Sequence, residues 1–145
     1  MRITDVCTRL DDAVAIAAMF VCIVRMLYRL RRGNQRWRTY APMLINENRW
    51  RAQRYGLDEG LMDFGKGEIV PVADLIEELI DLISEDAEAL GCADELNHIR
   101  EIVRDGTGAH RQLDTFAAAE ATGASRDEAL AAVVDMLIEE TVKGL

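Results

Sequence analysis

The sequence predicts a mainly α-helical domain with one short N-terminal strand and one small hairpin. Apolar residues recur at helical spacing through most of the chain, glycines follow the helical segments as C-caps, and only two of the 145 residues are Pro. A chain of this length is typical of one domain, and half of its residues are hydrophobic. We therefore expect one unit over 1–145, with a strand over 1–7 and a helical body over 8–145.

The first 33 residues predict the strand and a long helix. Residues 1–7 alternate apolar and polar side chains, which is typical of a strand. Thr8 followed by Asp11 resembles a capping box that opens a helix ending at Gly33. Residues 13–24 are apolar around nearly the whole helix, which indicates packing inside something larger. This run is shorter than the roughly 20 residues that span a bilayer, so we expect no membrane insertion.

The rest of the chain predicts five more helices and the hairpin. Pro42 suits the first turn of a helix that runs to Tyr55, and two short strands flank a glycine-rich turn near 61–71. Apolar spacing, glycine stops and a Ser125–Glu128 capping box place the other helices at 72–90, about 94–104, about 109–121 and 125–143.

Charge is divided unevenly along the chain. Residues 1–60 carry 11 Arg and six acids, a net +5, whereas residues 61–145 carry a net −14. The basic half either meets phosphates or attracts the acidic half, and composition leaves both interpretations open. The overall charge of −9 and pI near 4.7 argue against a nucleic-acid-binding surface, so no nucleic-acid partner is expected.

The residues that commonly hold metals give no ligand pattern. Three cysteines contain no CxxC and leave one over, which indicates neither zinc nor a disulfide framework and fits a reducing cytoplasm. His98 and His110 lie on separate predicted helices, where packed or solvated roles are expected. The acids within 76–86 are expected on the solvated face of an amphipathic helix.

Two features are candidates for chemistry. As part of a strand, Arg2 suits bidentate binding of a phosphate or carboxylate, and the alternative is a surface Arg at a frayed terminus. Residues 46–56 form the densest polar and aromatic cluster, with Trp50 and Arg54 four residues apart, as are Arg51 and Tyr55. This cluster suits an anionic or nucleotide ligand. Alternatively, Trp50 packs in the core and the arginines pair with acids of the second half. We expect Trp50 to be mostly buried and Trp37, in a predicted loop, to be the more exposed of the two tryptophans.

Five segments in order resemble the C-terminal part of the bacterial carboxylate–amine ligases of the glutamate–cysteine ligase type 2 family. They are 2–13, 47–57, 63–65, 86–91 and 106–113. The second matches the family pattern Asn-Arg-Trp-x-Ala-x-Arg-Tyr-Gly completely at 48–56. In the last, relatives often have Ser and Asp where this chain has Gly108 and His110, and Arg111 matches.

The resemblance implies a fold similar to glutamine synthetase, an α+β ligase with helices packed behind an antiparallel sheet. It also implies a reaction in which ATP and Mg²⁺ activate a small-molecule carboxylate as an acyl phosphate, which an amine converts to an amide. Full members are more than twice this length. We therefore expect this chain to be the helical C-terminal portion, which needs the N-terminal portion as its partner and is inactive alone.

The resemblance also implies site residues. The family pattern Glu-x-Arg-x-x-Asp places its Glu, a Mg²⁺ ligand, one residue before Met1, and assigns Arg2 to the transferred phosphoryl group. Arg49, Arg54 and Tyr55 are implied to line the substrate or nucleotide site, and no metal ligand is expected within the chain itself. The competing hypothesis is a non-catalytic helical module for protein interaction or homodimerisation.

Overall fold

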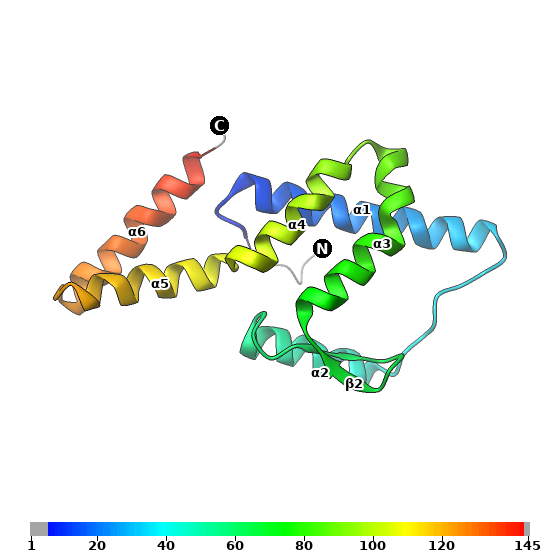
Figure 1. Cartoon of the computed structure of the whole chain (residues 1–145), viewed down its shortest axis with the longest axis horizontal. Coiled ribbons are helices and arrows are strands. Elements are labelled where there is room, and N and C mark those ends of the chain that lie inside the picture. The colour runs from blue at the N-terminus through cyan, green and yellow to red at the C-terminus, as the bar shows by residue number, and fades with distance from the viewer. Residues whose placement is uncertain (1–5, 144–145) are drawn as a thin grey trace.

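The computed structural model describes residues 6–143, which contain six helices and one two-stranded antiparallel sheet (Figure 1). The mainly helical class and the hairpin are confirmed. The elements in chain order are α1 (Leu10–Arg32), α2 (Pro42–Tyr55), β1 (Leu61–Asp63), β2 (Glu68–Val70), α3 (Val72–Leu90), α4 (Ala93–Asp105), α5 (Gly108–Ala121) and α6 (Arg126–Val142).

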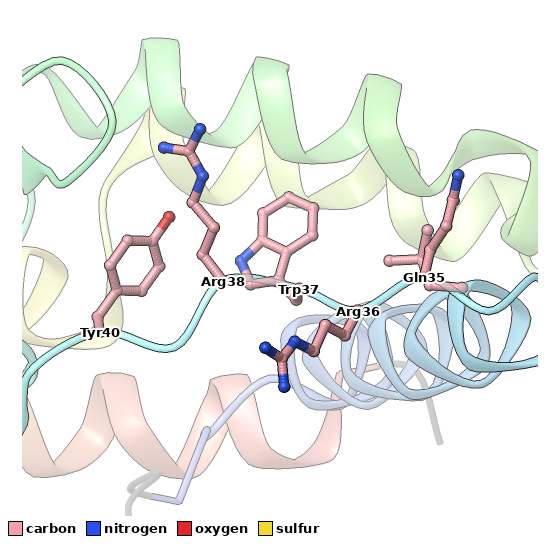
Figure 2. A pocket seen from close by; sticks show the side chains of 6 residues that line it. Gln35, Arg36, Trp37, Arg38 and Tyr40 are labelled. Atoms are coloured by element: carbon pink, nitrogen blue, oxygen red, sulfur yellow. The ribbon is translucent and has the colours of Figure 1, made fainter.

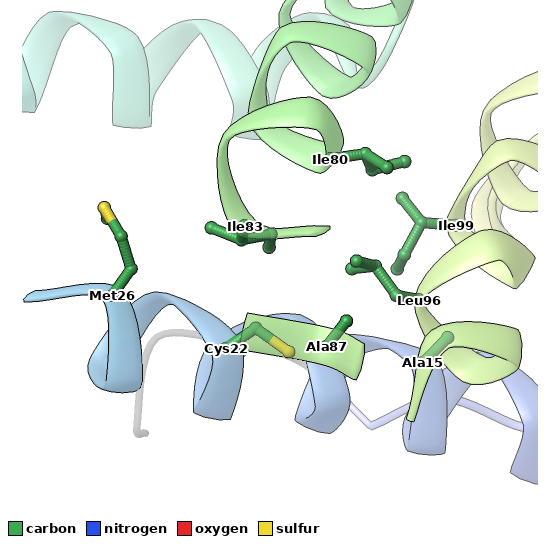
Figure 3. Packing of buried hydrophobic residues seen from close by; sticks show 8 residues of the cluster. All are labelled: Ala15, Cys22, Met26, Ile80, Ile83, Ala87, Leu96 and Ile99. Atoms are coloured by element: carbon green, nitrogen blue, oxygen red, sulfur yellow. The ribbon is translucent and has the colours of Figure 1, made fainter. Parts of the chain in front are cut away.

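The core lies where α1, α3 and α4 pack against one another, and α5 and α6 form a separate helical pair beyond the end of α4 (Figure 1). The predicted helical spacing of the apolar residues produces this core, because side chains three and four apart share a helix face. Eight buried residues form it: Ala15, Cys22, Met26, Ile80, Ile83, Ala87, Leu96 and Ile99 (Figure 3).

Helix ends follow the local signals in the sequence. Gly91 adopts a left-handed φ of 69°, and the next N–H, from Cys92, bonds the Ala87 carbonyl at 3.0 Å, so the chain turns sharply from α3 into α4. The Ser125–Glu128 capping box at the start of α6 is present, as predicted. Both ends are set by neighbouring residues, which explains why the sequence alone located them.

The hairpin is attached to α2 by side chains of the polar cluster. Asn48 donates from Nδ2 to the Met62 carbonyl at 2.8 Å and accepts from the Met62 N–H at 2.7 Å. Arg51 donates to the carbonyls of Glu59 and Gly60 at 2.9 and 3.1 Å. These bonds satisfy backbone groups of β1, which has a neighbouring strand on one side only, and of the two residues before it, and they fix α2 beside β1.

The start of the chain differs from the prediction. Residues 1–5 of the expected strand lie outside the described residues, and Val6 and Cys7 are not in a strand. The expected capping box is wrong: the N-cap of α1 is Arg9, and the Thr8 hydroxyl donates to Glu140 Oε2 at 2.8 Å. The Thr8 hydroxyl therefore bonds a distant carboxylate and does not cap the helix as its position in the sequence had suggested.

The acidic stretch over 76–86 is also not uniformly solvated. Asp86 is completely buried and accepts hydrogen bonds from Arg25 and Arg29 across the α1–α3 contact, with Arg29 Nη2 at 2.9 Å. The Arg29 bond, reinforced by Arg25, holds the pKa of Asp86 below its usual value although burial opposes this. Here the basic and acidic halves do attract each other, as one of the two interpretations of the charge pattern required.

One face of α1 remains exposed although the helix is apolar around most of its circumference. The large exposed apolar residues on this helix are Leu10, Val14, Phe20, Val21, Val24, Leu27 and Tyr28. Among the described helices only α1 has the length and apolar composition that crossing a membrane requires, a criterion that core helices of soluble proteins also meet. The expectation that α1 packs inside something larger is thus fulfilled on one face only.

Candidate functional site

The last turn of α2 presents a cluster of cationic and aromatic side chains. The Arg51 and Arg54 guanidinium carbons lie 5.6 and 5.7 Å from the centre of the Tyr55 ring, within the range of cation–π contacts. Trp50 meets the same ring edge to face, with centroids 5.5 Å apart. Tyr55 is therefore the centre of the cluster, whereas the sequence had paired Arg54 with Trp50.

Trp50 itself is not a core residue, contrary to the expectation. It is 50% exposed and Trp37 is 46% exposed, so the expectation that Trp37 is the more exposed of the two is also wrong. The reason is that α2 has no buried residue: it lies beside the hairpin and outside the three-helix core. Neither Arg49 nor Arg54 forms an ion pair within residues 6–143, so pairing with acids of the second half is also wrong for these two.

A tight turn before α5 carries the second set of polar groups. Gly106 has a φ of 87°, and a Cβ there would lie 2.9 Å from the Cβ of His110, so the close approach requires glycine. The Thr107 N–H donates to His110 Nδ1 at 3.2 Å, and the Thr107 hydroxyl lies 2.8 Å from the same nitrogen. His110 therefore caps α5 as an Asp at this position would, which explains the departure from the family pattern.

This turn meets the end of α2, although some 50 residues separate them in the chain. Because Nδ1 of His110 accepts from a backbone N–H, its ring proton lies on Nε2, which donates to Asp58 Oδ1 at 3.3 Å. The His110 ring also lies over Gly56. Between the two segments is an open groove of about 460 Å³, lined by Arg54 and Tyr55 on one side and by Thr107 and His110 on the other.

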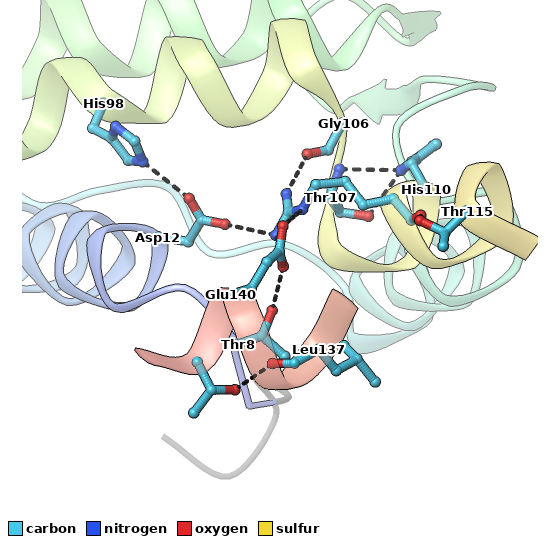
Figure 4. Close-up of polar contacts among 11 residues, drawn as sticks. Thr8, Asp12, His98, Gly106, Thr107, His110, Thr115, Leu137 and Glu140 are labelled. Atoms are coloured by element: carbon cyan, nitrogen blue, oxygen red, sulfur yellow. Dashed lines mark hydrogen bonds and ion pairs between the residues drawn. The ribbon is translucent and has the colours of Figure 1, made fainter. Parts of the chain in front are cut away.

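The same turn borders an ionic network of buried and half-buried side chains on its other side (Figure 4). Arg111 lies 3.2 Å from Asp12 Oδ2 through Nη2 and 2.7 Å from Glu140 Oε1 through Nε, and it donates to the Gly106 carbonyl. His98 Nε2 lies 2.9 Å from the other Asp12 oxygen. Burial alone would lower the pKa of Arg111, but Glu140 and Asp12 raise it above its ordinary value. The network joins α1, α4, α5 and α6.

The ionic network forms part of the wall of a second groove, of about 340 Å³. Val6, Cys7 and Thr8 line one side of it, and Thr107, Gly108 and Ala109 line the other. Residues of the first and last segments that resemble the ligase family therefore face each other. Arg2, the expected catalytic residue, lies outside the described residues, so its position relative to this groove stays a prediction.

The linker between α1 and α2 borders an open pocket of about 570 Å³ (Figure 2). Arg36, Trp37, Arg38 and Tyr40 contribute to its wall, and Tyr40 packs on Phe64 of the hairpin with ring centroids 4.8 Å apart. The sequence singled out none of these residues as a site. A run from 13 to 46 without a single acid was a signal that could have drawn attention to it.

No group of three or more His, Cys, Asp or Glu within residues 6–143 is arranged to hold a metal ion. The histidines instead take part in the hydrogen bonds described above, as the packed interpretation predicted. The two grooves offer one guanidinium each, from Arg54 and Arg111, and Arg111 is neutralised by two carboxylates. Asp58 and Glu59 also line the first groove, but neither forms an ion pair with Arg54. Arg54 is thus the expected site residue best placed to receive an anionic ligand.

Comparison with known proteins decides the family. The model of glutamate-cysteine ligase family 2 (GCS2) matches residues 1–135. This chain belongs to that family. The resemblance to the C-terminal part of its members, read from the five segments, is thereby confirmed.

Individual relatives support the same family assignment. The chain is 66% identical over all 145 residues to a protein of Rhodospirillum rubrum, 49% identical over 139 residues (96% of the chain) to one of Jannaschia sp. and 47% identical over 145 residues to one of Sorangium cellulosum. Each is named "putative glutamate–cysteine ligase 2". The chain spans 37%, 36% and 36% of their lengths, respectively. No solved structure matches it.

Proposed function

We propose that this chain is the C-terminal portion of an ATP-dependent carboxylate–amine ligase of the glutamate–cysteine ligase type. One observation carries the proposal: three of the family-like segments converge in space. In the Gly106–Leu113 segment, the His110 ring lies over Gly56 at the end of the 47–57 segment and bonds Asp58 just after it, while Arg111 contacts Asp12 at the start of α1. If these segments served packing alone, they would not have to line the same grooves. A ligand site assembled from them does require this arrangement.

Within the groove, the residues of this chain would bind and orient a ligand. Arg54 is exposed and unpaired within residues 6–143, and its contact with Tyr55 restricts the directions that its guanidinium takes. A planar guanidinium binds a carboxylate or phosphate through two parallel hydrogen bonds. We assign Arg54 to an anionic oxygen of substrate or nucleotide, Tyr55 to positioning Arg54, and Arg49 to the exposed rim of the same helix.

ATP, when bound, supplies the phosphoryl group that activates the carboxylate for attack by the amine. Mg²⁺ does not fit the residues described here, since they contain no carboxylate cluster, and magnesium needs several oxygen ligands. We propose that an N-terminal ligase portion supplies those ligands. The chain alone should then show no ATP-dependent ligation, and the whole enzyme should act on small carboxylates and amines in the cytoplasm.

The test is Arg54→Lys in a ligase that contains both portions. Lysine keeps the charge but loses the planar fork, so turnover should fall at least about tenfold, which corresponds to about 1.4 kcal/mol, while the thermal melt stays unchanged. Arg126→Lys, on the distant α6, is the matched control and should keep full turnover. Unchanged turnover in the Arg54 variant would remove this residue from the site, and an equal loss of stability and activity would assign it to the scaffold.

A second candidate function, a non-catalytic interaction or homodimerisation module, is supported by the exposed apolar face of α1. Light scattering on the purified 145-residue chain separates the two proposals when combined with the ligation assay. A stable dimer, together with no ligation after the N-terminal portion is added, would favour the module. Restored ligation by the combined portions would favour the ligase.

A further inference from the structure

Two of the three cysteines meet in the core although 70 residues separate them. Cys22, in the middle of α1, and Cys92, at the N-cap of α4, have sulfurs 3.6 Å apart. Cys22 is completely buried among the core residues (Figure 3), whereas Cys92 is half-buried at the α3–α4 turn. A disulfide needs the sulfurs at about 2.05 Å, so they must approach each other by about 1.5 Å.

We propose that Cys92 and Cys22 form a thiol–disulfide exchange site that reacts with low-molecular-weight disulfides and closes into a disulfide between α1 and α4. The inference rests on the sulfur contact and the unequal exposure of the two thiols. It does not depend on the ligase activity. The pair is not evident from the sequence, because the two cysteines have no motif spacing.

The exposures fix the order of the two steps. The Cys92 thiolate, which solvent reaches, attacks the small disulfide RSSR, forms the mixed disulfide Cys92–S–SR and releases RS⁻. The Cys22 thiolate then attacks the Cys92 sulfur, forms the Cys22–Cys92 bond and releases the second RS⁻. The two thiol protons end on the two RS⁻ groups, so the small disulfide is reduced to two thiols while the protein loses two hydrogens.

The environment of Cys22 disfavours its thiolate, so Cys22 is not the residue that attacks first. Burial, followed by the hydrogen bond with Cys92, raises the pKa of Cys22 to about 11, so the resting Cys22 is a protonated thiol. Once Cys92 carries the RS group, the contribution of the Cys92 thiol to that shift disappears. Burial remains, so closure should be slower than the first exchange.

Closing the disulfide should stabilise the helical core. The bond would join α1 to the N-cap residue of α4 and close a loop of roughly 70 residues, which restricts the unfolded chain strongly. For a domain of this size we expect the melting temperature to rise by about 5 to 15 °C. This increase should reverse when dithiothreitol reduces the bond.

The experiment incubates the purified chain with excess glutathione disulfide and follows intact mass and thermal melting. Wild type and Cys7→Ser should each lose two hydrogens and gain thermal stability. Cys22→Ala should stop at the first step and keep one glutathionyl group on Cys92. Cys92→Ser should show neither the disulfide nor the stabilisation.

Three results would overturn the proposal. The first is a wild-type chain that keeps its original mass and melting temperature. The second is a disulfide that includes Cys7, and the third is a Cys92→Ser chain that responds as wild type does. Because Cys22→Ala leaves a small apolar residue in the core, its trapped adduct tests the first step even if its melting temperature is lower.

Discussion

Asp86 offers the strictest test of the core, because its carboxylate is completely buried and has two cationic partners. Asp86→Asn removes the charge and leaves one acceptor oxygen of nearly the same shape. Breaking a fully buried ion pair costs roughly 3 to 5 kcal/mol. Here Arg25 and Arg29 are 36% and 39% exposed, so water compensates part of the loss, and we expect about 2 to 3 kcal/mol.

The assay is thermal and urea unfolding of the 145-residue chain at pH 7. A loss of that size should lower the melting temperature by about 6 to 10 °C, from the usual unfolding entropy per residue. The control is Glu85→Gln on the same helix: Glu85 is largely exposed and lies 3.4 Å from Arg29, so its loss should cost less than about 1 kcal/mol. Equal melting temperatures for the two variants would refute the reasoning.

The pH dependence gives an independent check on Asp86. Its pKa is lower in the folded chain than in the unfolded chain, so the unfolded state takes up the proton first as the pH falls. The stabilisation is therefore fully present above about pH 5 and is lost as the pH drops below about 3.9 toward the folded pKa. The gap between wild type and Asp86→Asn should narrow below pH 4, and a constant gap down to pH 3 would contradict the assignment.

Three further substitutions test local features of the fold by urea unfolding. Asn48→Ala removes both bonds to Met62 and should cost about 1 to 2 kcal/mol, and an unchanged stability would mean that α2 is not fixed to the hairpin by this pair. Ser125→Ala removes the α6 capping box and should cost about 1 kcal/mol. Trp50→Ala should cost only about 1 to 2 kcal/mol, because the ring is half-exposed, and a loss of 3 kcal/mol or more would show that it is buried in solution.

Helix limits were predictable because the signals that set them lie within a few residues. Gly91 ends α3 and Pro42 begins α2 at the expected positions. The beginning of α1 was not predictable in this way. Thr8 had a local role available as a cap, but Glu140, 132 residues further along the chain, provides its actual partner. A local rule fails where a distant group competes for the same hydrogen bond.

The burial of Asp86 has a local signal in the sequence. It lies three residues after Ile83, so it falls on the apolar face of α3 and not on the acidic one. Asp12 lies three residues before the buried Ala15 at the start of α1, and so on the same face. An acid on the apolar face of a helix must find a cation or a proton in the core, and in both cases arginines provide the charge. The identity of those arginines depends on the tertiary fold, which spacing does not reveal.

The Gly106–Leu113 segment is where the candidate site depends most on this tertiary pairing. Its Arg111 is held by Asp12 from the start of the chain and by Glu140 from its last helix, and the neighbouring His110 is held by Asp58 from the turn after α2. Each partner comes from a different element, so none of the three contacts fixes this turn alone. A change at Gly106, the residue that brings the backbone close to His110, would move both side chains together. Both grooves therefore depend on one short turn.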